Sequence, residues 1–284
     1  MNDILTEKEY QHFIMEQLKS NNGYRIRHAT KEGGDYDRRF AMDRNLLLEF
    51  LGSTQPKGMA EIRKIYKDKA DGTVISFINQ EIVKKGSGLI PVLKNGVDLT
   101  PSIHLDLMYT RPATDFNKDL LKKYEQNIFS VMEEVWPDDD SRIDLVIFLN
   151  GLAIMSFELK CNPAGQSYGD AIEQYRTSRD PKNRLFLFKT GCFVNFAMDL
   201  EQVYMATRLS GDSTFFLPFN RGCGKDINRG AGNEINEETG FGVDYMWDDI
   251  LKKDTVLDLI SKYIFVEKKE KSTRIPKRKR RARR

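Results

Sequence analysis

Two apolar segments joined by Asn-Gly constrain the fold of this chain more than any other feature. Residues 142–160 read RIDLVIFLNGLAIMSFELK, and both runs are typical of buried β-strands. Asn150-Gly151 between them is a strong hairpin signal. Three charged residues, Asp144, Glu158 and Lys160, nevertheless lie on these strands. The position of these three charges in the hairpin therefore needs an explanation.

The length of the hairpin turn decides whether the three charges meet. With a two-residue loop, Asp144 and Glu158 point to opposite faces of the sheet, because side chains alternate along a strand. With a three-residue loop at 149–151 and a bulge, they lie diagonally on one face, about 7–8 Å apart at the backbone. Lys160 then joins them on that face. We predict the three-residue loop, because it gathers all three charges.

A cation between the two acids would give this cluster a chemical purpose. Mg²⁺ prefers oxygen ligands and keeps several waters, so two carboxylates and a phosphate suit it well. A bound divalent cation can lower the pKa of water and stabilise charge at phosphorus, and the ammonium of Lys160 can position the attacking water. Glu-x-Lys alone is common in a chain with 31% charged residues, and it recurs at 267–269. The apolar strands favour the catalytic interpretation over a solvated face.

The net charge of +3 is unevenly distributed along the chain. Residues 267–284 hold eleven Lys or Arg and two Glu, a net charge of +9, which leaves 34 basic and 40 acidic residues, or −6, in residues 1–266. Such a basic segment attracts nucleic acid without reading its sequence, and the alternative is a disordered terminus with no partner. We expect one large domain over residues 1–266, followed by a basic, disordered tail over residues 267–284.

Signals for membrane insertion or secretion are missing from the sequence. No run of 18 uncharged apolar residues occurs, and the N-terminus MNDILTEKEY lacks the core of a signal peptide. We therefore expect a soluble protein of the cytoplasm with no membrane partner. The three cysteines show no metal-ligand spacing and are expected to stay reduced.

Local patterns predict a mixture of helices and strands. Thr6 and Glu9 form a capping box for a first helix that ends before Gly23. Weaker helical patterns run to about residue 85. Residues 89–99 resemble a hairpin turning at Asn95-Gly96, and 103–109 alternate like a strand. Further helices are expected near 117–127, 166–178 and 245–264, and strands at 184–189, 192–198 and 202–209. This mixture favours an α/β sheet covered by helices, with an N-terminal helical region.

Longer segments resemble the N-terminal nuclease domain of the R (restriction, motor) subunit of type I restriction enzymes. The resemblance rests on the following segments, in chain order: TEKEYQHFIMEQL, NNGY, DYDRRFAMD, STQP, YEQNIFSVMEEV, RIDLVIFLNGLAIMSFELK, AIEQYRTSRDP, FAMDLEQVYMATRL, TFFLPFNRG, GAGNE and YMWDDILKKDTVLDLISKYI. Their order and spacing are specific, and they extend to about residue 266.

This resemblance implies a PD-(D/E)xK nuclease with a restriction-endonuclease-like core, a mixed sheet flanked by helices. The family motif matches Asp144, Glu158 and Lys160 as catalytic residues. It also implies that Asp144, Glu158 and the backbone carbonyl of Leu159 hold Mg²⁺. The expected partners are double-stranded DNA and the modification (M) and specificity (S) subunits. Because the S subunit reads the DNA sequence in this family, no base-reading residues are expected here.

The chain departs from the family pattern at two supporting positions. Related nucleases often carry Gln four residues before a Tyr on the helix that follows the motif. Tyr175 fits, but the Gln position holds Ala171, so Gln174 is the nearest substitute. A further acid is expected from the first helix, and Glu9 and Glu16 are both candidates.

The helicase-like motor of the family is a third departure. The family continues into this motor soon after the position of Thr273, whereas this sequence continues as RIPKRKRRARR. No G-x-x-x-x-G-K-[ST] loop occurs, and GCGKD at 222–226 has Asp226 where a Mg²⁺-binding hydroxyl is required. We therefore expect no ATP site, in either a fragment of a longer R subunit or a shortened natural product.

The leading hypothesis is a Mg²⁺-dependent DNA endonuclease domain of a type I restriction-modification system. Asp144, Glu158 and Lys160 would carry the reaction, and Gln174 and Tyr175 would support the site. The alternative is a non-catalytic DNA-binding or subunit-docking module.

Overall fold

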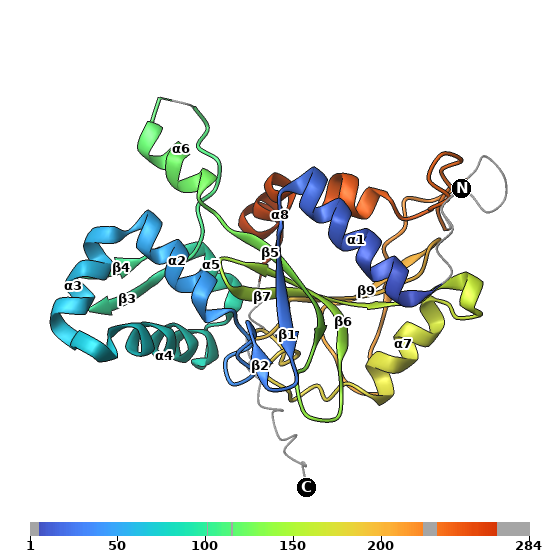
Figure 1. Ribbon diagram of the computed structural model, residues 1–284, viewed down its shortest axis with the longest axis horizontal. Helices are drawn as coiled ribbons and strands as arrows, with labels where there is room; N and C mark the ends of the chain where they lie inside the picture. Colours follow the sequence, from blue (N-terminus) through green and yellow to red (C-terminus); the bar gives the residue numbers. More distant parts are fainter. Residues whose placement is uncertain (1–5, 101, 115, 224–231, 266–284) are drawn as a thin grey trace, which may run out of the picture.

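The computed structural model describes residues 6–100, 102–114, 116–223 and 232–265. These residues form an eight-stranded mixed sheet with the strand order β10-β9-β8-β7-β6-β5-β1-β2, and a separate two-stranded sheet of β3 and β4. Helices pack on the large sheet, as the sequence predicted (Figure 1). In the described part of the chain, no helix is long and apolar enough to cross a membrane. The predicted tail, residues 267–284, and most of 222–226 lie outside the described residues.

The strands of the large sheet run in mixed directions. Their bounds are β1 (Arg25–Thr30), β2 (Gly33–Gly34), β5 (Phe129–Val135), β6 (Ile143–Leu149), β7 (Leu152–Leu159), β8 (Val194–Met198), β9 (Val203–Ala206) and β10 (Leu217–Pro218). β5, β6 and β7 pair antiparallel, whereas β1 pairs with β5 and β7 with β8 in parallel. Every residue of β6 and β7 is buried, which explains their continuous apolar sequence.

The helices are distributed unevenly around the sheet. They are α1 (Glu7–Asn22), α2 (Arg44–Thr54), α3 (Pro56–Tyr66), α4 (Ala70–Val83), α5 (Leu89–Asn95), α6 (Lys118–Glu125), α7 (Tyr168–Thr177) and α8 (Lys253–Asp258). Figure 1 shows α2 to α5 gathered with β3 (Val97–Thr100) and β4 (Ile103–Leu105) at one side, α6 projecting, and α7 at the opposite side. The capping box of α1 and its exit at Gly23, with a φ of 63°, are confirmed.

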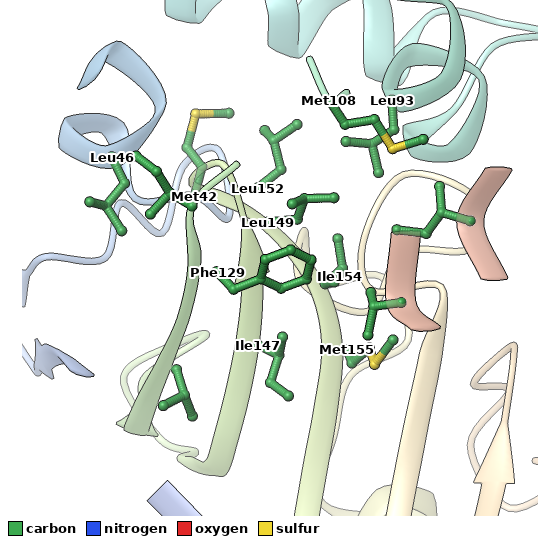
Figure 2. Packing of buried hydrophobic residues seen from close by; sticks show 14 of the residues in the cluster. Met42, Leu46, Leu93, Met108, Phe129, Ile147, Leu149, Leu152, Ile154 and Met155 are labelled. Atoms are coloured by element: carbon green, nitrogen blue, oxygen red, sulfur yellow. The ribbon is translucent and has the colours of Figure 1, made fainter. Parts of the chain in front are cut away.

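Two hydrophobic cores lie on opposite faces of the large sheet. The first core is covered by α1, α2, α5 and α8 and receives Leu145, Ile147 and Leu149 from β6. The second core is covered by α7 and receives Ile143, Val146 and Phe148. Side chains therefore alternate between the two faces from Leu145 to Leu149, whereas Ile143, at the start of β6, also belongs to the second core. Figure 2 shows the first core, where strand residues meet side chains of α2 and α5.

Two segments differ from the sequence predictions. Residues 89–95 form helix α5 and not a strand of a hairpin, and Gly96, with a φ of 64°, caps this helix by donating its N–H to the carbonyl oxygen of Val92. An Asn-Gly pair suits both structures, so the local signal was ambiguous. The predicted strand at 184–189 is also wrong: this segment forms turns that bury Leu185 and Phe186 in the second core.

Candidate active site

The turn between β6 and β7 has two residues, and the predicted three-residue loop is wrong. Asn150 and Gly151 both have positive φ, 50° and 81°, as in the type I′ turn that Asn-Gly favours. A Cβ atom on Gly151 would lie 2.3 Å from the carbonyl oxygen of Asp43, so only glycine fits there. The turn is therefore held both by its own conformation and by the backbone packed against it.

A β-bulge at Ile154 nevertheless brings the two acids to a common face. The pairing of β6 with β7 shifts by one residue at this point. Ile154 and Met155, although adjacent, both point into the first core (Figure 2). Beyond the bulge Val146 pairs with Ser156 and Leu145 with Phe157, so Asp144 and Glu158 occupy the next positions in this register. The two acids are near neighbours, because the charge of Asp144 contributes to the raised pKa of Glu158. The bulge thus brings the two acids to one face of the sheet, an effect that the sequence analysis had attributed to a three-residue loop.

Asp144 is buried at the start of β6, with 6% of its surface exposed. Its Oδ2 accepts a hydrogen bond of 2.7 Å from the backbone N–H of Leu159. Burial raises the pKa of Asp144 to about 6, and the nearby negative charge of Glu7 adds to this effect. Asp144 is therefore an acid that titrates close to neutral pH.

Glu158 is completely buried at the end of β7. Its Oε1 accepts a hydrogen bond of 2.5 Å from Nε of Arg179, whereas its Oε2 has no hydrogen-bond partner in the described part of the chain. Burial, followed by the charge of Asp144, raises the pKa of Glu158 well above its usual value, and the positive charges of Arg179 and Lys160 oppose this shift. Burying Oε2 without a hydrogen bond destabilises the folded protein unless a bound ligand interacts with this oxygen.

Lys160 follows β7 on the same face and forms an ion pair with helix α1. Its Nζ lies 2.7 Å from Oε2 of Glu7, the first residue of α1. The sequence had pointed to Glu9 or Glu16 for the acid of this helix. Glu9 closes the capping box of α1, and Glu16 forms a surface ion pair with Lys19. Glu7, which the sequence did not single out, contacts the cluster directly through Lys160.

Arg179 is a second member of the cluster that sequence reasoning did not identify. It lies just after α7, and its Nη2 donates a hydrogen bond of 2.6 Å to the carbonyl oxygen of Arg142. No local pattern distinguishes Arg179 from the other basic residues of its segment. Its partner Glu158 lies 21 residues earlier, so only the fold brings them together.

The two predicted supporting residues have different environments. Tyr175 is fully buried, and its hydroxyl lies 2.8 Å from that of Ser156, which in turn donates to Oδ1 of Asn195. The charge of Glu158 contributes to the raised pKa of Tyr175, behind burial itself, so the two side chains are near each other. Gln174 is half-buried, and its side chain has no hydrogen bond with any residue that the structure describes.

The oxygen atoms at this site fit a hard divalent cation. Asp144 and Glu158 lie near each other on β6 and β7, and Oε2 of Glu158 has no hydrogen-bond partner among the residues that the structure describes. The N–H of Leu159 points toward Asp144, and in an antiparallel ladder the carbonyl of the same residue faces the same strand. An all-oxygen set of this kind suits Mg²⁺ better than Zn²⁺. Within the described ranges, no group of three or more His, Cys, Asp or Glu side chains is placed to hold a metal, so backbone oxygen and water would complete the ligands.

The chain matches a known protein family. A family model described as the N terminus of the type I restriction enzyme R protein matches residues 4–214. This range contains every residue of the cluster and confirms the resemblance noted in the sequence. A search of the curated proteins found no match.

Proposed function

Because this chain belongs to the family of the type I restriction enzyme R protein N terminus, we propose that it is a Mg²⁺-dependent DNA endonuclease domain. One observation carries the proposal: Asp144 and Glu158 are both buried on the paired strands β6 and β7, at positions that continue the register of the two strands, with the buried Lys160 beside them. Neighbouring carboxyl groups in an apolar environment are unfavourable unless a cation or a proton compensates them. An arrangement that costs stability is typical of a functional site.

The proposed roles follow from the contacts of each side chain. Asp144, Glu158 and the Leu159 carbonyl would hold the cation, and the Leu159 N–H keeps Asp144 oriented toward it. A bound divalent cation would supply Lewis-acid stabilisation of a phosphodiester and would lower the pKa of water. The ammonium of Lys160, held by Glu7, would donate a hydrogen bond to the phosphate or to the attacking water.

The family also suggests the substrate and partners. Membership in an R protein family supports DNA as the substrate and assembly with other subunits. We propose double-stranded DNA, with M and S subunits as the partners and sequence reading assigned to the S subunit. Residues 267–284, with a net charge of +9, would add attraction to DNA that does not depend on sequence.

Nicking of supercoiled plasmid by the full chain tests this proposal. The parent should nick with Mg²⁺ or Mn²⁺ and not with EDTA, and Asp144→Asn, Glu158→Gln and Lys160→Ala should each abolish nicking. Asp140→Asn, which changes an exposed acid near the same strand, is the matched control and should behave like the parent. Circular dichroism checks that each variant is folded. If Asp144→Asn or Lys160→Ala nicked as fast as the parent, the assignment would be wrong.

A non-catalytic DNA-binding or docking module is the second candidate. The basic charge of residues 267–284 favours it, together with the small number of side-chain ligands at the site. The two candidate functions predict different results for the parent protein. No nicking under any metal condition, with DNA affinity lost on deletion of 267–284, would favour the module over the nuclease.

A further inference from the structure

Arg179 places a buried guanidinium behind Glu158. Only 4% of the Arg179 side chain is exposed, and its Nε lies 2.5 Å from Oε1 of Glu158, which is itself completely buried. A side chain this enclosed cannot contact DNA directly. Any contribution it makes to the site must therefore act through Glu158.

The guanidinium is fixed by the backbone on two further sides. Nη2 donates to the carbonyl oxygen of Arg142 at 2.6 Å, just before β6, and Nη1 donates to that of Ser178 at 3.3 Å, at the end of α7. Arg179 therefore joins the start of β6, the end of β7 and the end of α7. To move away from Glu158, it would have to break all three contacts. The three contacts therefore fix the position of the guanidinium relative to Glu158.

The contact with Arg179 uses only one oxygen of Glu158. Oε1 accepts the hydrogen bond from Arg179, whereas no residue within the described ranges donates a hydrogen bond to the buried Oε2. Carboxylates that hold metal ions are commonly oriented by a hydrogen bond to the oxygen that does not bind the metal. The fixed guanidinium and the vacant lone pairs of Oε2 match this arrangement.

We propose that Arg179 is a positioning residue that orients Glu158, holding Oε1 so that Oε2 is presented to the divalent cation. This inference rests on the proposed function, because the cation is that of the nuclease site. Two effects of Arg179 oppose each other. Its positive charge weakens the attraction of the site for a cation, whereas its hydrogen bond fixes the ligand. We infer that the orientation dominates, because the guanidinium is held on three sides.

The sharpest test is the affinity of the full chain for Mn²⁺, measured by calorimetry at constant pH without DNA. Arg179→Met should weaken Mn²⁺ binding by about tenfold or more, the usual loss when a partner of a metal ligand is removed. Arg179→Lys, which keeps the charge but not the planar fork of donors, should fall between Met and the parent. Arg176→Met is the matched control, since Arg176 lies on α7 but donates to the carbonyl of Thr214. It should bind Mn²⁺ like the parent.

The outcomes separate this inference from the proposed function. If the parent binds Mn²⁺, Glu158→Gln loses it, and Arg179→Met binds as tightly as the parent, only the role of Arg179 is rejected. Tighter binding by Arg179→Met would show that charge dominates and would also reject it. A parent that binds no Mn²⁺ overturns the proposed function and this inference with it. Should Arg179→Met fail to fold, Arg179→Lys decides, and an affinity equal to that of the parent overturns the proposal.

Discussion

Nζ of Lys160 lies 2.7 Å from a carboxylate oxygen of Glu7, although 153 residues separate them in the chain. This ion pair joins the start of α1 to the end of β7 at the candidate active site. The Lys160 side chain is only 7% exposed, so the pair is better shielded from water than an ordinary surface pair. The position of the ammonium therefore depends on Glu7.

Glu7→Gln should lower the nicking rate by about tenfold, because Lys160 loses the charged partner that orients it. The same change should move the acid limb of the pH–rate profile to lower pH, since the charge of Glu7 contributes to the raised pKa of Asp144. Glu16→Gln, on the exposed side of the same helix, is the control. A Glu7→Gln enzyme with the rate and pH profile of the parent would contradict a role for this pair.

Asp144 should also affect the stability of the metal-free protein. Burial raises its pKa from 3.8 to about 6, so the folded state binds this proton more tightly than the unfolded state. The stabilising contribution is complete below about pH 4 and is lost as pH rises through 6, by up to about 3 kcal/mol. Asp144→Asn should therefore stabilise the protein at pH 7, where asparagine can still accept the hydrogen bond from Leu159.

Urea unfolding in EDTA at pH 4 and pH 7 checks this prediction. The gain in the free energy of unfolding for Asp144→Asn should be largest at pH 7 and should shrink toward pH 4. An inactive variant that is more stable than its parent would indicate a residue retained for chemistry and not for folding. A variant less stable than the parent at pH 7 would show that the ionised carboxylate is compensated within the protein itself.

The sequence predicted the features that depend on local patterns. The capping box of α1 and the apolar strands of the hairpin were correct, because periodicity and capping are encoded by neighbouring residues. The bulge at Ile154 was not predicted, because it lies in a run of apolar residues where an extra residue breaks no visible pattern. The contacts of Glu7 and Arg179 with the cluster could not be predicted either, since they depend on the placement of distant elements.

Gly151→Ala should test how strictly the turn sets the register of the site. An added Cβ would lie 2.3 Å from the Asp43 carbonyl oxygen, and the φ of 81° is unfavourable for alanine. We expect a loss of about 3–5 kcal/mol in the free energy of unfolding, because a rigid backbone must move. Gly165→Ala is the matched control, with a φ of 80° and no atom within 4 Å of the added Cβ.

The control should cost only about 1 kcal/mol, which is the conformational cost alone. Thermal or urea unfolding of both variants separates the clash from the strain. Equal losses for the two variants would mean that the backbone near Asp43 gives way easily. In that case the turn would not be the fixed point from which the register of Asp144 and Glu158 is set.

Tyr175 and Gln174, the two residues predicted to support the site, should differ on mutation. The Tyr175 hydroxyl is buried and lies 2.8 Å from that of Ser156, so Tyr175→Phe should cost about 1 kcal/mol of stability through the lost hydrogen bond. The nicking rate of the folded protein should not change, because the hydroxyl does not reach solvent. Gln174→Ala should leave both stability and rate unchanged, as its side chain has no hydrogen bond within the described part of the chain. A tenfold loss of nicking in a stable Tyr175→Phe protein would instead place that hydroxyl among the groups that orient Glu158, its near neighbour on the α7 face.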